Sequence, residues 1–113
     1  MRKTLLLLLI LASAFTTYLW AGTTGKLTGK VTDKKSKEPL AFVTVVVEGT
    51  KFGATTDING DYVILNIPPG KYNVRAQYIG YAASVIEGVA ISVDLTTTKN
   101  FELSESSVEL STV

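Results

Sequence analysis

The chain has 113 residues, with 11 Lys and Arg, 10 Asp and Glu, and neither histidine nor cysteine. This length allows one domain with a modest core, and the missing residue types exclude disulfides, thiol nucleophiles and the commonest general base and metal ligand. The charges nearly balance, which argues against a nucleic-acid surface, so we expect a domain that is not an enzyme and that binds neither a cofactor nor a metal.

Residues 1–21 have the features of a signal peptide. Arg2 and Lys3 give a positive start, an unbroken apolar run follows, and Ala21 offers a small residue for cleavage. The apolar run is short for a membrane span, which needs about 20 apolar residues. We therefore predict export with cleavage after Ala21. The alternative is an uncleaved anchor with Trp20 at the membrane interface.

From residue 22 onward, apolar and polar side chains alternate, which is the period of β-strands. The alternation predicts seven short strands, at residues 26–32, 41–48, 53–56, 62–67, 72–78, 89–95 and 100–103. The expected core comprises the apolar positions of these strands, namely Leu27, Val31, Val43, Val45, Val47, Tyr62, Ile64, Tyr72, Val74, Ala76, Tyr78, Val89, Ile91, Val93, Leu95, Phe101 and Leu103. Because no helix intervenes to support parallel crossovers, we expect mainly antiparallel sheets. The pattern therefore predicts an all-β domain, a seven-stranded β-sandwich over residues 22–103.

Turn-forming residues separate the predicted strands. Residues 57–60 read Asp-Ile-Asn-Gly, which favours a tight hairpin because Asn and Gly tolerate positive φ. Ile67 falls out of phase with the strand before it, which predicts a bulge or the end of the strand near Asn66. Pro68 and Pro69 then end that strand, because proline cannot donate to a ladder.

The turn residues also form an ordered pattern along the chain. Its pieces are Gly-Lys-Val-Thr-Asp at 29–33, Glu-Pro-Leu-Ala at 38–41, Thr-Asp-Ile-Asn-Gly-Asp-Tyr at 56–62, Ile-Pro-Pro-Gly-Lys-Tyr at 67–72 and Tyr-Ile-Gly-Tyr at 78–81. This pattern resembles the carboxypeptidase regulatory-like domain over nearly the whole chain after the signal peptide. The resemblance implies a transthyretin-like or prealbumin-like sandwich with an Ig-like Greek key. It also implies an accessory role without catalysis.

One setting of this family implies a function. Such domains follow a signal peptide at the N-terminus of TonB-dependent outer-membrane receptors and precede the plug and the barrel. Residues 104–113 are rich in Ser and Glu and resemble the stretch that leads toward the plug. We therefore expect a linker over 104–113, toward a plug domain that is missing from this sequence.

The resemblance also implies a location and partners. The domain would lie on the periplasmic face of the outer membrane, as a fragment or truncated form that transports nothing by itself. It would meet the membrane only through the missing barrel, and its partners would be the receptor plug and barrel or components of the TonB system. The alternative is a free-standing secreted module that binds carbohydrate or protein.

Three polar residues near the predicted hairpin are candidates for surface binding. Asp57, Asn59 and Asp61 place oxygens at the spacing that opens a calcium loop. A complete loop also needs a glutamate at its twelfth position, where this chain has Pro68. The spacing therefore favours a polar turn capped by Asp and Asn over a calcium site.

Tyr81 is the fourth candidate. Tyr62, Tyr72 and Tyr78 fall on core-facing positions of the predicted strands, where they pack with the hydroxyl at the sandwich edge. Tyr81 instead follows the strand break at Gly80. We therefore predict that Tyr81 is the best exposed aromatic residue for binding a carbohydrate.

Overall fold

The computed structural model describes residues 23–106, and the predicted signal peptide and residues 107–113 lie outside that range. Within it the chain forms eight strands and no helix, in the order β1 (Gly25–Asp33), β2 (Thr44–Val47), β3 (Gly53–Thr55), β4 (Asp61–Ile67), β5 (Gly70–Gln77), β6 (Ser84–Ile91), β7 (Thr96–Thr98) and β8 (Phe101–Leu103). Across the same residues no helix is long and apolar enough to cross a membrane. The all-β prediction is confirmed, but the predicted count of seven strands is wrong by one.

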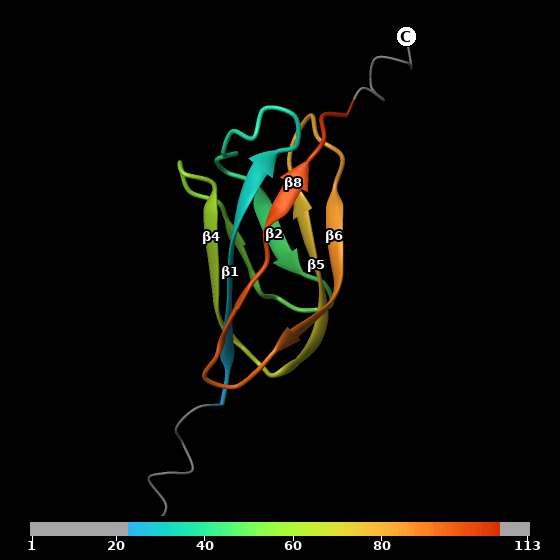
Figure 1. Ribbon diagram of the computed structural model, residues 1–113. Coiled ribbons are helices and arrows are strands. Elements are labelled where there is room, and N and C mark those ends of the chain that lie inside the picture. Colours follow the sequence, from blue (N-terminus) through green and yellow to red (C-terminus); the bar gives the residue numbers. More distant parts are fainter. Residues whose placement is uncertain (1–22, 107–113) are drawn as a thin grey trace, which may run out of the picture.

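The strands form two sheets (Figure 1). One sheet has the order β4-β1-β7, with β8 also paired to β1, and the other has the order β3-β2-β5-β6. Most pairs are antiparallel, as predicted, but β7 and β8 both run parallel to β1. Parallel pairing is allowed here because a long stretch of chain, including the whole second sheet, separates β1 from β7 in the sequence.

The eighth strand arises because the returning chain, which runs alongside β1, breaks its pairing opposite Gly29. β7 pairs with β1 before this point and β8 pairs with it afterwards. Between the two strands, Lys99 N–H donates to Thr28 O at 2.8 Å and Lys30 N–H donates to Asn100 Oδ1 at 2.9 Å. A Cβ atom on Gly29 would lie 1.7 Å from the Lys99 carbonyl oxygen. Only glycine therefore permits this close approach of two backbones.

The strand prediction makes two errors near this return. The pattern misses β7 because its three threonines carry no apolar alternation. It also extends the predicted strand 89–95 past Ile91, where β6 ends. Asp94 has a φ of 60° and turns the chain back toward β7, so Val93 and Leu95 are 38% and 61% exposed and lie outside the core.

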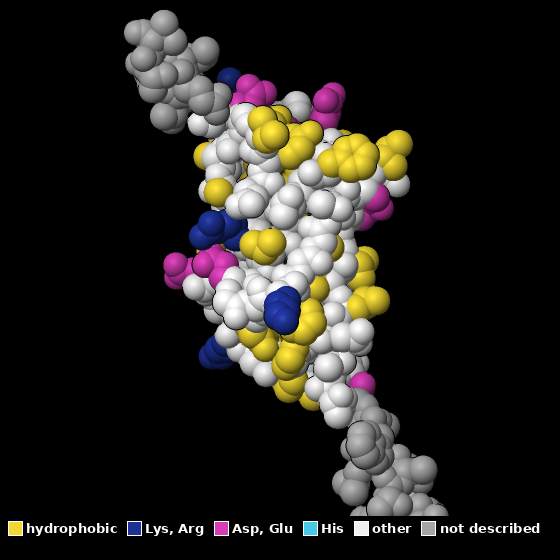
Figure 2. Space-filling view, turned by 180° about the vertical axis from the view of Figure 1, so that it is seen from behind, with side chains coloured by type: hydrophobic (Ala, Val, Ile, Leu, Met, Phe, Trp, Pro, Cys, Tyr) yellow, Lys and Arg dark blue, Asp and Glu magenta, His cyan; other side chains and the backbone are white. Residues whose placement is uncertain are grey.

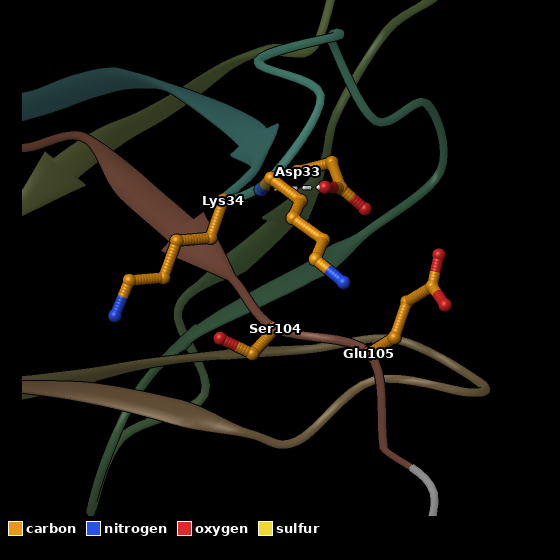
Figure 3. A pocket seen from close by; sticks show the side chains of 5 residues that line it. Asp33, Lys34, Ser104 and Glu105 are labelled. Carbon is orange, nitrogen blue, oxygen red and sulfur yellow. Dashed lines mark hydrogen bonds between the residues drawn. The ribbon is translucent and has the colours of Figure 1, made fainter.

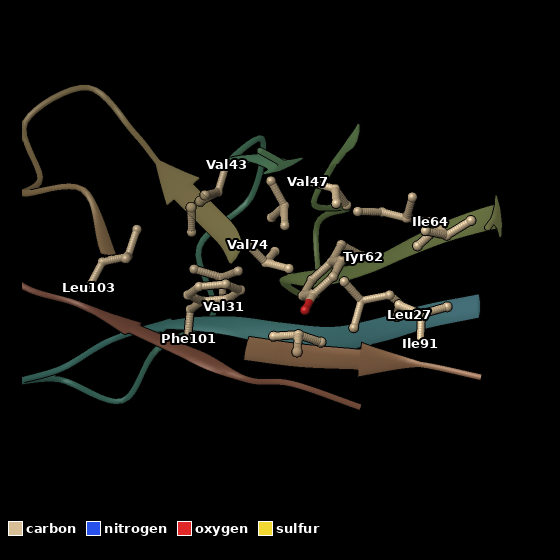
Figure 4. Packing of buried hydrophobic residues seen from close by; sticks show 14 residues of the cluster. Leu27, Val31, Val43, Val47, Tyr62, Ile64, Val74, Ile91, Phe101 and Leu103 are labelled. Carbon is tan, nitrogen blue, oxygen red and sulfur yellow. The ribbon is translucent and has the colours of Figure 1, made fainter. Parts of the chain in front are cut away.

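The core takes side chains from both sheets. It consists of Leu27, Val31, Val43, Val45, Val47, Tyr62, Ile64, Ile67, Val74, Ala76, Val89, Ile91, Phe101 and Leu103. Figure 4 shows the Tyr62 ring in the middle of this cluster, and its centroid lies 6.1 Å from that of Phe101. The Tyr62 hydroxyl donates to Lys99 O at 2.6 Å, so its one polar atom is paired. The alternation thus predicted most of the core correctly, while Tyr72 and Tyr78 are only half-buried.

Two turn predictions have opposite outcomes. Asn66 has a φ of 60° and the β1–β4 register shifts beside it, so the predicted bulge is confirmed. The turn at 57–60 exists but is not a hairpin, because β3 belongs to one sheet and β4 to the other. Gly60 has a φ of 80° whereas Asn59 does not have positive φ, so the turn is not the hairpin type that Asn-Gly favours. The chain uses it to pass between the sheets.

Candidate functional site

Four segments gather at the end of the sandwich where β1, β3, β5 and β8 finish, namely residues 34–43, 56–60, 78–83 and 104–106 (Figure 1). We call these four segments the loop end. Ser106 N–H donates to Gly80 O at 2.8 Å, and Ala82 N–H donates to Ser104 O at 2.9 Å. The first residues of the predicted linker therefore lie against the β5–β6 loop.

Thr56 fixes the first of these segments. Its side chain is 2% exposed and its hydroxyl donates to Leu40 O at 2.6 Å. The same hydroxyl oxygen accepts from Val43 N–H at 2.9 Å. On the main chain, Phe42 N–H donates to Thr56 O at 3.0 Å. These contacts hold residues 40–43 in one conformation.

Replacing Thr56 with valine is expected to destabilise the domain by about 1–3 kcal/mol. Valine has the same shape but no hydroxyl, so Leu40 O and Val43 N–H would lose a buried partner. Urea unfolding followed by circular dichroism measures this loss. The neighbouring Thr55→Val variant, at an exposed position of β3, is the control and should unfold at the wild-type midpoint. Equal midpoints for all three proteins would contradict the role given to Thr56.

Phe42 is held in a conformation that bulky residues rarely adopt. Its φ is 64°, in the left-handed region, and its side chain is 72% exposed. Such a conformation costs of order 1–3 kcal/mol and persists only where neighbouring contacts impose it. The contacts of Thr56 supply that constraint. The result is an aromatic ring presented to solvent at the loop end.

Ile79 presents a second apolar side chain beside Phe42. It is 95% exposed and sits in a turn closed by Tyr81 N–H donating to Tyr78 O at 3.1 Å. Phe42 and Ile79 line a shallow hollow of about 360 Å³ together with Thr44, Gln77 and Tyr78. We call these five residues the Phe42–Ile79 patch. Figure 2 shows hydrophobic side chains gathered at this end of the molecule, on the face opposite to that of Figure 1.

Asp33 organises the other side of the loop end. Its side chain is buried, and one carboxylate oxygen accepts from Lys35 N–H at 2.8 Å and Ser36 N–H at 3.0 Å. The other oxygen accepts from the Tyr81 hydroxyl at 2.7 Å. The donors Ser36 N–H, Tyr81 O–H and Lys35 N–H lower the pKa of the Asp33 carboxyl below its usual 3.8. Asp33 therefore joins the turn after β1 to the β5–β6 loop.

Tyr81, predicted as an exposed aromatic residue, is half-buried. Its ring lies 5.6 Å from that of Tyr78 in a tilted arrangement. Its hydroxyl is committed to Asp33, and that hydrogen bond is the main reason that the pKa of Tyr81 is raised to about 12. Tyr81 therefore stabilises the loop end and leaves only part of its ring free for stacking.

The Asp33–Tyr81 contact predicts a stability difference that depends on pH. In the folded state the pKa of Asp33 lies below 3.8, so its contribution is full above that pH and is lost as the pH falls through the lowered value. The pKa of Tyr81 rises from 10.0 to about 12, so its contribution is full below pH 10 and is lost as the pH rises toward 12.

The Tyr81→Phe variant tests this pH dependence. It should be less stable than wild type from about pH 5 to about pH 9, and the gap should close below pH 3.8 and above pH 10. Urea midpoints of both proteins across this range measure the gap. Burial also raises the pKa of Tyr62. Tyr62 is present in both proteins, so its contribution cancels in the comparison. A gap that does not change with pH would contradict the ionic nature of the contact.

A second hollow, of about 460 Å³, lies beside Asp33 and is lined by Asp33, Lys34, Lys35, Ser104 and Glu105. Figure 3 shows Ser104 and Glu105 on the chain beyond β8, facing the turn that follows β1. The lining mixes both signs of charge, and the Asp33 carboxylate is already engaged in structural hydrogen bonds. Residues 23–106 contain no group of three or more Asp and Glu side chains arranged to hold a metal ion.

Asp57, Asn59 and Asp61 lie together on a different loop of the same end. Asp57 Oδ1 accepts from Asn59 N–H at 2.9 Å and from Asp61 N–H at 3.0 Å. This is the geometry of an aspartate that caps its own turn. The described residues show no hydrogen bond between this turn and Tyr81, so the four predicted binding residues form two separate groups.

The most exposed part of the loop end was not predicted from the sequence. The alternation places Phe42 in a strand over residues 41–48, whereas β2 begins only at Thr44. The sequence pattern indicates no role for Thr56 or Ile79. One available signal was Ile79 directly before Gly80, an apolar residue at a turn where burial is difficult.

The domain family follows from the sequence motifs together with this fold. The CarboxypepD_reg-like domain family model matches residues 27–113, and the chain belongs to this family. The match runs through the predicted linker to Val113. The predicted resemblance is thereby confirmed. A comparison with curated proteins finds no match.

Solved structures share the fold. A mutant type II cohesin–X-dockerin complex from Acetivibrio cellulolyticus is similar with a TM-score of 0.60 and 23% identity, over 70% of this chain and 56% of that chain. A candidate carbohydrate-binding protein from Bacteroides uniformis is similar with a TM-score of 0.54 and 14% identity, over 69% of this chain and 40% of that chain. The minor pilin of Streptococcus agalactiae is similar with a TM-score of 0.52 and 19% identity, over 76% of this chain and 46% of that chain. At these identities the likeness shows the β-sandwich fold alone, and this chain spans little more than half of each structure or less.

Proposed function

We propose that this domain is a non-catalytic binding module that docks on another protein through the Phe42–Ile79 patch. The observation that carries the proposal is the exposure of Phe42 and Ile79, 72% and 95%, around one hollow at the loop end. Large apolar side chains gathered on a surface mark a site for a partner. A contact between the Phe42 ring and that partner would also offset the free-energy cost of its positive φ.

The chain leaves the domain beside this patch. Ser106 N–H donates to Gly80 O, next to Ile79 in the sequence. Any polypeptide that continues beyond residue 106 therefore starts close to the patch. This placement supports the reading of the domain as the periplasmic extension of a TonB-dependent outer-membrane receptor, in which the patch would face the receptor plug or a component of the TonB system.

The gene downstream of the Val113 codon tests the receptor proposal. The proposal expects a plug domain followed by a long series of amphipathic strands of about ten residues. A stop codon directly after Val113, together with stable expression of the short product, would overturn the receptor setting. It would favour the free-standing secreted module.

Carbohydrate binding is the second candidate function, and one observation favours it. The exposed Phe42 ring offers an apolar face that the half-buried Tyr81 does not. Glycan-array binding should then be lost in Phe42→Ser and kept in Tyr81→Phe. An array without binding by the wild-type protein would remove this candidate.

A further inference from the structure

Strand β4 (Asp61–Ile67) is an edge strand with apolar side chains on both faces. Among the described strands it pairs with β1 and with no other. Tyr62 and Ile64 point into the core, whereas Val63 and Leu65 are 50% and 55% exposed on the outer face. An edge strand of this composition is a ready template for another strand.

The register shows which backbone groups face the free edge. Val31 N–H donates to Gly60 O at 2.8 Å, and Gly29 is paired with Tyr62 in the same register. Alternate residues of an antiparallel strand bond to opposite sides, so Val63 directs its N–H and C=O away from β1. Asp61 O, on the same side, is already occupied by Asp57 N–H at 2.9 Å. The open stretch is therefore centred on Val63.

The other sheet edges carry protection that β4 lacks. β3, β7 and β8 have three residues each, too few for a stable added strand. β6 contains Glu87 and Gly88, and Gly88 has a φ of 66° where the β5–β6 register shifts. Bulges and charges of this kind block edge-to-edge pairing. β4 has neither lysine nor proline, and its bulge lies beyond Leu65, at Asn66.

We propose that β4 pairs with β4 of a second copy of this chain, antiparallel about a two-fold axis at Val63. In this register Val63 lies opposite Val63 of the second copy, Tyr62 opposite Ile64, and Asp61 opposite Leu65. The two Asp61 carboxylates are then four residues apart along the pair, roughly 13 Å, so they do not oppose each other. Apolar side chains meet apolar side chains at the centre, and the single charge falls at each end. This self-complementarity selects a second copy as the occupant.

Sedimentation velocity on the protein expressed as residues 1–113 tests this dimer. Between about 1 μM and about 1 mM the wild type should pass from monomer to dimer. Val63→Lys should remain monomeric throughout, because lysine on an edge strand opposes pairing. The matched control is Val85→Lys, at a 42% exposed position of the protected edge strand β6, and it should dimerise like the wild type.

Two results would overturn the dimer. One is a wild-type protein that stays monomeric over the whole concentration range. The free edge of β4 would then be available to a strand from a different protein. The other is a Val63→Lys variant that dimerises like the wild type while its circular dichroism is unchanged. Hydrogen exchange adds a local readout, since the Val63 amide should become protected only at the higher concentration. The Phe42–Ile79 patch lies outside this interface, so the two proposals stand or fall separately.

Discussion

The Gly29→Ala variant is expected to lose about 3 kcal/mol of folding free energy or more. The added Cβ atom would lie 1.7 Å from Lys99 O and 2.7 Å from a ring carbon of Tyr62. Backbone on one side and a packed aromatic ring on the other leave no free space for the methyl group. The contact between β1 and the chain that joins β7 to β8 must therefore open. Small domains have only about 5–15 kcal/mol of stability, so this loss would remove a large share of it.

Urea and thermal unfolding of Gly29→Ala, followed by circular dichroism, measure this effect. The neighbouring Lys30→Ala variant is the control, because Lys30 is exposed and its contact with Asn100 uses its backbone N–H. Lys30→Ala should therefore unfold close to the wild-type midpoint. A Gly29→Ala protein as stable as this control would contradict the close approach of Lys99 to Gly29.

The Tyr62→Ala variant is expected to lose about 3–5 kcal/mol of folding free energy, the range for removing a large buried aromatic ring. Tyr62 is 2% exposed, lies at the middle of the core and packs against Phe101. Tyr62→Phe keeps the ring but removes the donor to Lys99 O, so it should cost about 1 kcal/mol. The two variants together separate the packing of the ring from its hydrogen bond.

Urea midpoints of both Tyr62 variants provide the measurement. The order of stability should be wild type, then Tyr62→Phe, then Tyr62→Ala. If Tyr62→Phe were as unstable as Tyr62→Ala, the hydroxyl would be the dominant contribution and the packing of the ring would contribute little. A Tyr62→Ala protein with wild-type stability would remove Tyr62 from the core.

Most of the fold could be predicted from alternation because each face of a strand meets a different environment. Leu27, Val31, Phe101 and Leu103 occupy alternate positions and are buried as expected. The bulge near Asn66 was also readable, since a bulge shifts the phase of the alternation.

The errors fall where long-range packing, and not the local pattern, decides the structure. β7 is a strand because β1 offers it a partner, and its threonines give no sign of this. The 57–60 turn looks like a hairpin locally, yet β4 pairs with β1 in the other sheet. Which strands pair depends on the whole core and not on the turn residues alone.

The binding surface was harder to predict than the core. The strand break before Tyr81 predicts an exposed ring, but a hydrogen bond to Asp33, distant in sequence, draws Tyr81 inward. Phe42 was placed in a strand, but the contacts of Thr56 put it in a loop with positive φ. Both outcomes depend on side chains that meet only after the sheets have formed.

Cross-linking from position 79 tests whether the Phe42–Ile79 patch docks on another protein. A photoreactive amino acid replaces Ile79 in cells that express the protein from its own gene, and Lys51, exposed on the β2–β3 turn, is the control position. We expect a cross-link from position 79 to the receptor plug or to a TonB-system component, no such product from position 51, and loss of the product in the Phe42→Asp background. Equal products from the two positions, or none from position 79, would contradict the proposal that the Phe42–Ile79 patch docks on a protein.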